Sequence, residues 1–252
     1  MNIEGNKIIF DYDVSSFNFY DIFKQHLSIF GIDNLENFHS DCSQTLLPKE
    51  IVTVKNDQLT PAYKILYEID EGYYLKNSYN PGKFLNTYKD FVYYLSSTIL
   101  KEELVYQRKP TLRIHFPENK AVGGFHKDRE YNHPIEEINI WVPVTSAFNT
   151  NTIWIESAFD KEDYSPMNLN FGQGLIFDSG LNHGNKVNVE NLTRLSFDFR
   201  VIPSFAYDED NPPESCTTKQ KFIVGEYYEM INRDTTPDMY DPIENAKLGE
   251  AC

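Results

Sequence analysis

One stretch of the sequence decides the fold class, Arg194-Leu195-Ser196-Phe197-Asp198-Phe199-Arg200-Val201. Apolar and polar side chains alternate strictly along it, and a period of two is the pattern of a β-strand with one apolar and one polar face. The same alternation recurs upstream over residues 112–116, 138–144 and 152–156, and residues 174–177 form a short apolar run. We therefore predict a chain built mainly of β-strands.

Several short strands separated by turn signals are typical of a β-sandwich or a β-barrel. We expect a mainly β fold of the double-stranded β-helix type, the cupin-like jelly roll, in which one strand face lines the interior. If the polar face looks inward, the interior is a ligand cavity. If it looks outward, the chain is an ordinary sandwich, and the alternation alone leaves both open. The polar face carries Arg113, Asn139, Trp141, Thr152, Trp154, Arg194 and Ser196.

The N-terminal part of the chain carries two helical patterns. Residues 17–30 place apolar side chains on one face, with Ser16 as the expected cap and Gly31 as the stop. A second helix is expected from Asn80-Pro81 to about Leu104. We expect both helices to pack on the apolar face of the sheet. We expect one domain over 1–252, with helical or mixed N-terminal support over 1–110, a jelly-roll core over 111–203 and a C-terminal covering segment over 204–252.

The composition limits the class of partner. The chain of 252 residues has a formal net charge of −15, which argues against nucleic acid and against an anionic membrane surface. A local cluster of arginines can still bind a small anion. Three cysteines without metal-binding spacing fit a reducing compartment, and we find neither a signal peptide nor a run long enough to span a bilayer. We expect a cytoplasmic monomer or homodimer that acts on a small molecule.

The stretch Gly123-Gly124-Phe125-His126-Lys127-Asp128 carries the candidate chemistry. His126 and Asp128 share one side of an extended segment, and His183 follows a later predicted strand. Two imidazoles and one carboxylate with open coordination positions are the facial triad of non-haem Fe(II) oxygenases. Taken alone, a His-x-Asp pair is better explained by a solvated loop.

Further residues favour a metal site over a solvated loop. Arg194 comes shortly after His183, Ser196 follows it, and Thr152-Ile153-Trp154 lies on a strand between the two histidines. Over residues 111–203 the chain resembles the 2-oxoglutarate/Fe(II)-dependent dioxygenases, whose signature is His-x-Asp, a distal His and a following Arg. The resemblance does not separate the taurine-dioxygenase, phytanoyl-CoA-hydroxylase and streptomycin-biosynthesis-like branches.

The resemblance implies a cofactor set and an activity. His126, Asp128 and His183 would be the catalytic ligands of Fe(II). Arg194, with Ser196, would bind the distal carboxylate of 2-oxoglutarate, a task that suits a planar guanidinium. The implied reaction oxidises a small molecule with O2 and releases succinate and CO2. Because Asp128 is retained, hydroxylation is favoured over halogenation.

Other side chains are candidates for weaker roles. Thr152, Arg113 and Asn139 are candidate contacts of the co-substrate. Arg129 and Trp141 are candidate contacts of the substrate, which is expected to be an amino acid, a peptide-derived intermediate or a sugar-type intermediate.

Alternatives stay open at several points. Arg200 shares a strand face with Arg194 and is a second candidate partner for the co-substrate carboxylate. One rival function is a cupin-type metal-dependent isomerase or dioxygenase that does not use 2-oxoglutarate. The other is a non-enzymatic binding protein with a degenerate site. Four histidines have no ligand spacing and are expected to be structural: His26, His39, His115 and His133.

Overall fold

The structure is a computed structural model that describes residues 2–4, 6–41, 70–71, 82–121, 124–216 and 219–231. Several sequence features lie outside these ranges. They include the predicted helix start at Asn80-Pro81, the glycine Gly123, and the cysteines Cys42 and Cys252.

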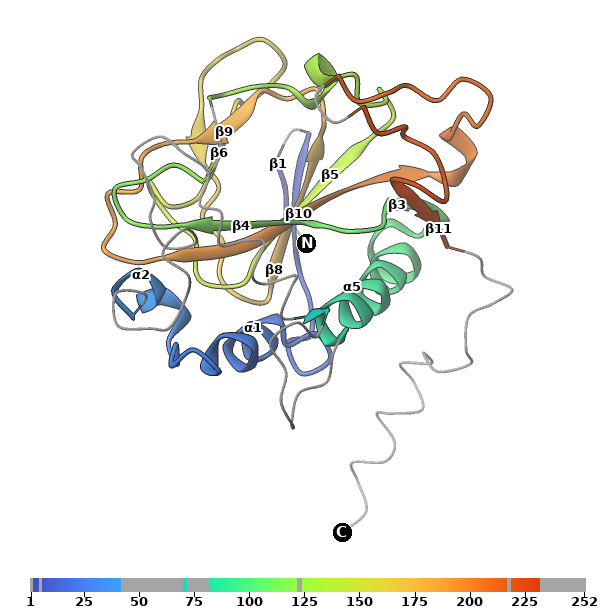
Figure 1. The fold of residues 1–252 in the computed structure, drawn as a ribbon. Coiled ribbons are helices and arrows are strands. Elements are labelled where there is room, and N and C mark those ends of the chain that lie inside the picture. The colour runs from blue at the N-terminus through green and yellow to red at the C-terminus, as the bar shows by residue number, and fades with distance from the viewer. Residues whose placement is uncertain are drawn as a thin grey trace.

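Two antiparallel sheets form the body of the described residues (Figure 1). The larger sheet contains β1 (Asn2–Glu4), β2 (Lys7–Asp11), β8 (Gln173–Asp178), β5 (Ile138–Pro143), β10 (Arg194–Pro203), β3 (Leu104–Gln107) and β11 (Tyr228–Met230) in that order, with β4 (Thr111–His115) also paired to β10. The smaller sheet contains β7 (Ser165–Pro166), β6 (Ile153–Ile155) and β9 (His183–Asn185). The prediction of a mainly β chain is confirmed. The double-stranded β-helix type and the division into three segments stay predictions.

The long strand β10 organises the larger sheet. Its first half pairs with β4, from Arg194 opposite His115 to Asp198 opposite Thr111. Its other edge pairs with β5, and its last residues pair with β3. Because successive side chains of a strand point to opposite faces, every second side chain of β10 lies on one face of the sheet and the others lie on the opposite face.

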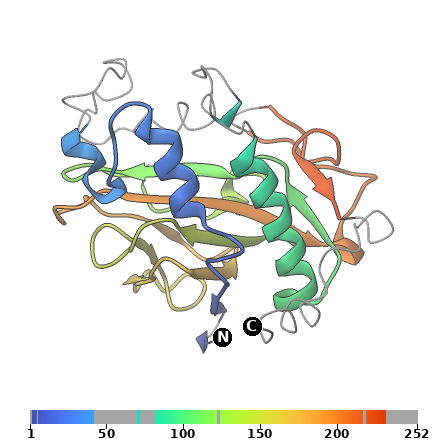
Figure 2. The ribbon, with the colours of Figure 1, turned by 90° about the horizontal axis from the view of Figure 1, so that it is seen from below.

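The apolar face of β10 packs against helices. The helices α1 (Phe19–Ser28) and α5 (Lys83–Tyr94) lie on one side of the larger sheet, and β6 and β9 lie on the other (Figure 1). From below, both helices run across the strands (Figure 2). Phe197 lies in this core, with its ring centroid 4.8 Å from that of Phe19 and 5.6 Å from that of Phe84. The prediction that helices cover the apolar sheet face is confirmed.

The helix ends differ from the prediction. The side chain of Asn18, and not that of Ser16, caps α1 by accepting a hydrogen bond from the amide of Asp21 at 3.0 Å. Ser16 instead donates to Asp13. After α5 the chain continues as a π-helical turn over Leu95–Leu100 and stops at Lys101, which has a left-handed φ of 60°. The second helix therefore ends before Leu104, which opens β3.

The alternation did not predict every strand. All four residues of β3 are buried, so its sequence shows no polar face, and β7 and β9 are too short to show a period. The remaining described elements are α2 (Phe38–Asp41) and the 3-10 turns Leu35–Asn37, Asp128–Tyr131 and Ser204–Ala206. Among the described residues, no helix combines the length and the apolar character needed to cross a bilayer.

The core between the helices and the sheet should depend on Phe197. We expect Phe197→Ala to lower the free energy of unfolding by about 3–5 kcal/mol, because it leaves a cavity among packed rings. Phe205, which is 79 % exposed, provides the matched control. Phe205→Ala should change stability by no more than about 0.5 kcal/mol. Urea unfolding of the two variants would contradict this packing if their losses were equal.

Candidate metal centre

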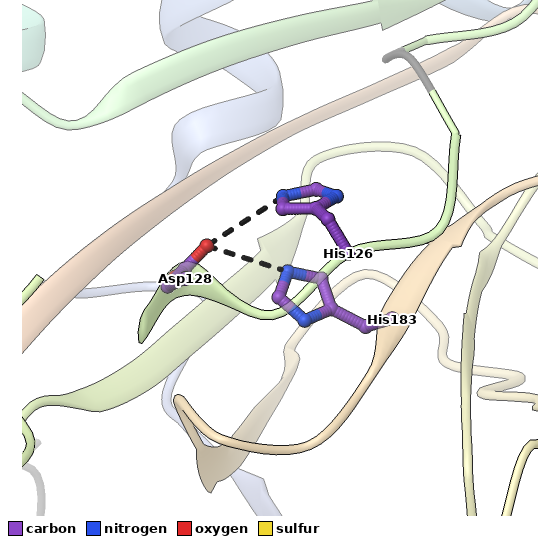
Figure 3. Close-up of side chains that lie close together, drawn as sticks. All are labelled: His126, Asp128 and His183. Atoms are coloured by element: carbon purple, nitrogen blue, oxygen red, sulfur yellow. Dashed lines mark ion pairs between the residues drawn. The ribbon is translucent and has the colours of Figure 1, made fainter. Parts of the chain in front are cut away.

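The structure brings three side chains together from two distant parts of the sequence (Figure 3). His126, Asp128 and His183 each offer one ligand atom, and these atoms lie within 4.8 Å of one another. The Oδ1 atom of Asp128 lies 3.6 Å from Nε2 of His126 and 3.8 Å from Nε2 of His183. Two imidazoles and one carboxylate fit a divalent transition metal that keeps open coordination positions.

Backbone pairing sets this geometry. The residues His126 and His183 face each other in an antiparallel bridge, with N···O distances of 3.0 and 2.9 Å. A Cβ atom at Gly184 would lie 3.0 Å from Cα of Phe125, so glycine permits the close approach of the two segments. The amide of Asp128 donates to the carbonyl of Ser179 at 3.2 Å, which ties the third ligand to the same loop.

Backbone carbonyls orient both imidazoles. Nδ1 of His126 lies 3.1 Å from the carbonyl oxygen of Gly124, and Nδ1 of His183 lies 2.9 Å from that of Leu181. A proton on each Nδ1 satisfies these contacts and leaves the lone pair of Nε2 free for a metal.

Glu156 anchors the segment that carries the distal histidine. Its carboxylate is fully buried and accepts backbone hydrogen bonds from Asn182 at 2.7 Å, from Lys161 at 3.0 Å and from Glu162 at 3.1 Å. The amide of Glu156 also donates to the carbonyl of Asn182. The sequence analysis missed this residue because a single acid at the end of a strand carries no motif.

Asp128 is tied to a chain of charges on the polar face of β10. Arg200 donates to its Oδ2 from Nε at 3.1 Å and from Nη2 at 3.0 Å. Nη1 of Arg200 donates to Asp198 at 2.9 Å, and Asp198 accepts from Arg113 at 2.9 Å. Burial alone would raise the pKa of Asp128, but the adjacent charge of Arg200, with a smaller contribution from the nearby His126, holds it well below its usual range.

Arg194 has a different environment from Arg200. It is 1 % exposed, and its guanidinium contacts only neutral groups, the carbonyl of Asn151 at 2.8 Å, Oγ of Ser196 at 2.5 Å and Nδ1 of His115 at 3.3 Å. Burial and the charge of Arg113 lower the pKa of Arg194 to about 9, so the group stays protonated at neutral pH. Within the described ranges no carboxylate forms an ion pair with it, and a buried cation with neutral partners suits an anionic guest.

One narrow cavity connects these groups. It is lined by His126 and His183 of the candidate metal centre and by Arg194 of β10. Asn139 and Trp141 of β5 also line it. The polar face of β10 therefore looks inward, which decides the question that the alternation left open. The cavity measures about 30 Å³, so a five-carbon diacid enters only if side chains move aside.

Three lining residues differ in how they are used. The ring of Trp141 lies 5.6 Å from the guanidinium carbon of Arg194. Arg113 lines the cavity while it pairs with Asp198. Asn139 is 3 % exposed, and among the described residues neither its side-chain oxygen nor its side-chain nitrogen has a hydrogen-bond partner. A buried amide without partners is costly, so Asn139 is suited to bind a polar guest.

The predicted orientation of Thr152 and Trp154 is wrong. Ile153 lines the cavity instead, and the hydroxyl of Thr152 donates to the carbonyl of Met167 at 2.5 Å. The ring of Trp154 is half-buried under the amine of Lys186, 3.4 Å from its centroid. The inner face of β6 is apolar because it packs on the cluster that contains Trp141 and Phe177, so the parity inferred from the larger sheet does not apply to it.

Two further predicted residues lie outside the cavity lining. Ser196 contacts Arg194, so it positions that guanidinium. Arg129 donates to Asp178 at 2.8 Å and to the carbonyl of Ile135 at 3.1 Å, and it lines a separate surface pocket. The guanidinium of Arg129 is turned toward the carboxylate that caps the next turn, so it does not line this cavity, and its contact with a substrate stays a prediction.

The histidines expected to be structural lie outside the ligand set. His133 contacts Glu137, His26 contacts Asp70, and His39 contacts Thr193. His115 has a further contact that the sequence did not predict. Its Nε2 lies 2.7 Å from the carbonyl oxygen of Asn119, and its Nδ1 lies 3.1 Å from the carbonyl oxygen of Asn151 and 3.3 Å from Nη2 of Arg194. In the tautomer with the proton on Nε2, that proton is donated to Asn119 and Nδ1 accepts from Arg194.

Comparisons with known proteins identify relatives. No protein-family model matches the chain. The streptomycin biosynthesis protein StrG of Streptomyces griseus is 30 % identical over 222 residues, which cover 87 % of this chain and 96 % of StrG. The crystal structure of AviO1 from Streptomyces viridochromogenes Tue57 is 11 % identical with a TM-score of 0.50, over 81 % of this chain and 93 % of AviO1, and this likeness concerns the fold alone. The non-heme alpha ketoglutarate dependent epimerase SnoN from nogalamycin biosynthesis is 10 % identical with a TM-score of 0.49, over 91 % and 95 % of the two chains.

The buried His115 should make stability depend on pH. Burial, followed by the charge of Arg194, lowers its pKa to about 3. Between that value and the unfolded value of about 6.5, the unfolded chain binds a proton that the folded chain does not. Stability should therefore be greatest above about pH 6.5 and should fall by about 1.4 kcal/mol per pH unit from this residue as the pH decreases.

Denaturant unfolding at several pH values measures this slope. His115→Gln removes the titrating group, so the variant should be less stable at neutral pH and less sensitive to acid. An equal acid sensitivity in the two proteins would contradict the assignment.

Proposed function

The chain belongs to the family of the streptomycin biosynthesis protein StrG, and we propose that it is a non-haem Fe(II) dioxygenase that uses 2-oxoglutarate and O2 to oxidise a small molecule. The observation that carries the proposal is the composition of one cavity. It contains two oriented imidazoles and, beside them, a buried arginine whose partners are all neutral.

The donor set fits iron. Nε2 of His126, Oδ1 of Asp128 and Nε2 of His183 would hold the metal, and their Nδ1 and Oδ2 atoms are already bound elsewhere. Bound iron with 2-oxoglutarate supplies the oxidation of an unactivated carbon, and the co-substrate leaves as succinate and CO2.

The rest of the cavity would orient the bound molecules. Arg194 would bind the distal carboxylate of 2-oxoglutarate with its forked guanidinium. His115 and Ser196 hold that guanidinium in place. Asn139 would supply one donor and one acceptor to the co-substrate or the substrate. The apolar walls at Ile153 and Phe177 would exclude water from the site.

A biosynthetic role is consistent with the family. StrG is named for streptomycin biosynthesis. We propose hydroxylation or a related oxidation of a small biosynthetic intermediate. Measuring succinate release from 2-oxoglutarate across a panel of amino acids, peptides and sugars tests the activity and selects among the three substrate classes.

Removing Arg194 separates this function from a metal enzyme that does not use 2-oxoglutarate. We expect Arg194→Met to keep metal binding and to weaken 2-oxoglutarate binding by about 100-fold, because a buried charged hydrogen-bond partner is lost. His126→Ala should lose the metal. Calorimetric titration of the metal and then of 2-oxoglutarate under anaerobic conditions measures both.

Arg108→Met is the matched control, because Arg108 is exposed and donates to the carbonyl of Gly225. It should leave both affinities unchanged. The proposal fails if the unchanged protein binds no metal or produces no succinate with any compound. Unaltered 2-oxoglutarate binding by Arg194→Met would favour the rival without this co-substrate.

Asn139 should affect stability and binding in opposite directions. Its side-chain amide has no partner within the part of the chain that the structure describes, so Asn139→Leu should raise the free energy of unfolding of the metal-free protein by about 1–3 kcal/mol. The same variant should weaken 2-oxoglutarate binding or substrate-stimulated succinate release. Thermal unfolding and the binding titration test the two effects, and a loss of stability would show that the amide has a partner.

A further inference from the structure

Arg200 approaches Asp128 in a way that distinguishes the two carboxylate oxygens. Both of its contacts, from Nε at 3.1 Å and from Nη2 at 3.0 Å, go to Oδ2. Oδ1 is left facing Nε2 of His126 at 3.6 Å and Nε2 of His183 at 3.8 Å. One oxygen of the carboxylate is thus directed to the metal position, and the other is saturated by a cation.

Arg200 is itself held in place. Asp198 accepts from its Nη1 at 2.9 Å, so each of the three guanidinium nitrogens donates to a carboxylate. Asp198 is held in turn by Nε of Arg113 at 2.9 Å. Arg113 and Asp198 come from the neighbouring strands β4 and β10. A guanidinium fixed on two sides has little freedom to follow a moving carboxylate.

Burial makes these contacts strong. The side chains of Arg200 and Asp128 are 10 % and 3 % exposed, so water screens their attraction weakly. A buried ion pair is seldom kept for stability alone, since its desolvation costs about as much as the attraction returns. One member of this pair, Asp128, is itself a candidate metal ligand, and Arg200 lies behind it, where it can set the orientation of that ligand.

We propose that Arg200, braced by Asp198, is a positioning residue that keeps Asp128 bound to the metal through one oxygen only. The inference rests on the proposed metal centre. A carboxylate free to bind through both oxygens would occupy one more coordination position. Holding Oδ2 away leaves that position open for an exchangeable molecule.

The test counts exchangeable water on the metal. Full-length protein is loaded with Mn(II), and water-proton relaxation gives the number of water molecules in its coordination sphere. Arg200→Met removes the charge and every donor but keeps the side-chain stem. We expect the Mn(II) of this variant to hold about one water fewer than in the unchanged protein, because Asp128 turns to bind through both oxygens.

Arg129→Met is the matched control. Arg129 adjoins Asp128 in sequence, but its guanidinium pairs with Asp178, so the same loss of charge should leave the water count unchanged. Asp198→Asn keeps Arg200 and loosens its support, and it should lower the water count in the same direction by a smaller amount. This variant also serves if Arg200→Met does not fold.

The outcomes separate the two proposals. If the unchanged protein binds no Mn(II), the metal centre falls, and this inference falls with it. If the unchanged protein binds Mn(II) and both variants keep its water count, the metal centre stands and the positioning role is overturned. If the role of Arg200 were purely structural, Arg200→Met would lower the unfolding temperature without changing the number of metal-bound waters.

Discussion

The structure depends on how charges are paired on the inner face of β10. That face carries Arg194, Asp198 and Arg200 in a cavity between two sheets. Charges removed from water must be paired or hydrogen-bonded. Two of the three are paired within the chain, through Asp128 and Arg113, while Arg194 is satisfied by neutral groups only. The unequal pairing separates a position for a metal ligand from a position for a guest anion.

The opposite face of the same strand stabilises the sheet that carries these charges. Its apolar side chains pack with α1 and α5 into one large core, which holds the sheet rigid. The inner face of the same sheet can then carry polar atoms without partners among the described residues, as Asn139 of β5 does. Sites placed on strands of a packed sheet are held more accurately than sites on loops. Of the two histidines, His183 lies on β9, and an isolated backbone bridge to His183 fixes the loop residue His126 opposite it.

The net charge of the chain is negative, whereas the charged side chains around the cavity are mainly positive. The chain as a whole carries −15. The cavity nevertheless collects three arginines, Arg113, Arg194 and Arg200, against the two carboxylates of Asp128 and Asp198. In a buried site the nearest charges dominate, because the distant ones are screened by solvent and salt. An acidic protein can therefore hold a locally cationic cavity.

The sequence by itself determined the strand pattern, the two-faced character of β10 and the candidate ligands His126, Asp128 and His183, because alternation and side-chain chemistry are local properties. It also singled out Arg194. It did not determine that the polar face looks inward, that Ile153 rather than Thr152 lines the cavity, or that Arg200 belongs to Asp128 and not to a guest. Nor did it show the support from Glu156 and His115. Only the tertiary structure decided these points, since each is a contact between segments far apart in the chain, and strand periodicity carries no information about which segments meet.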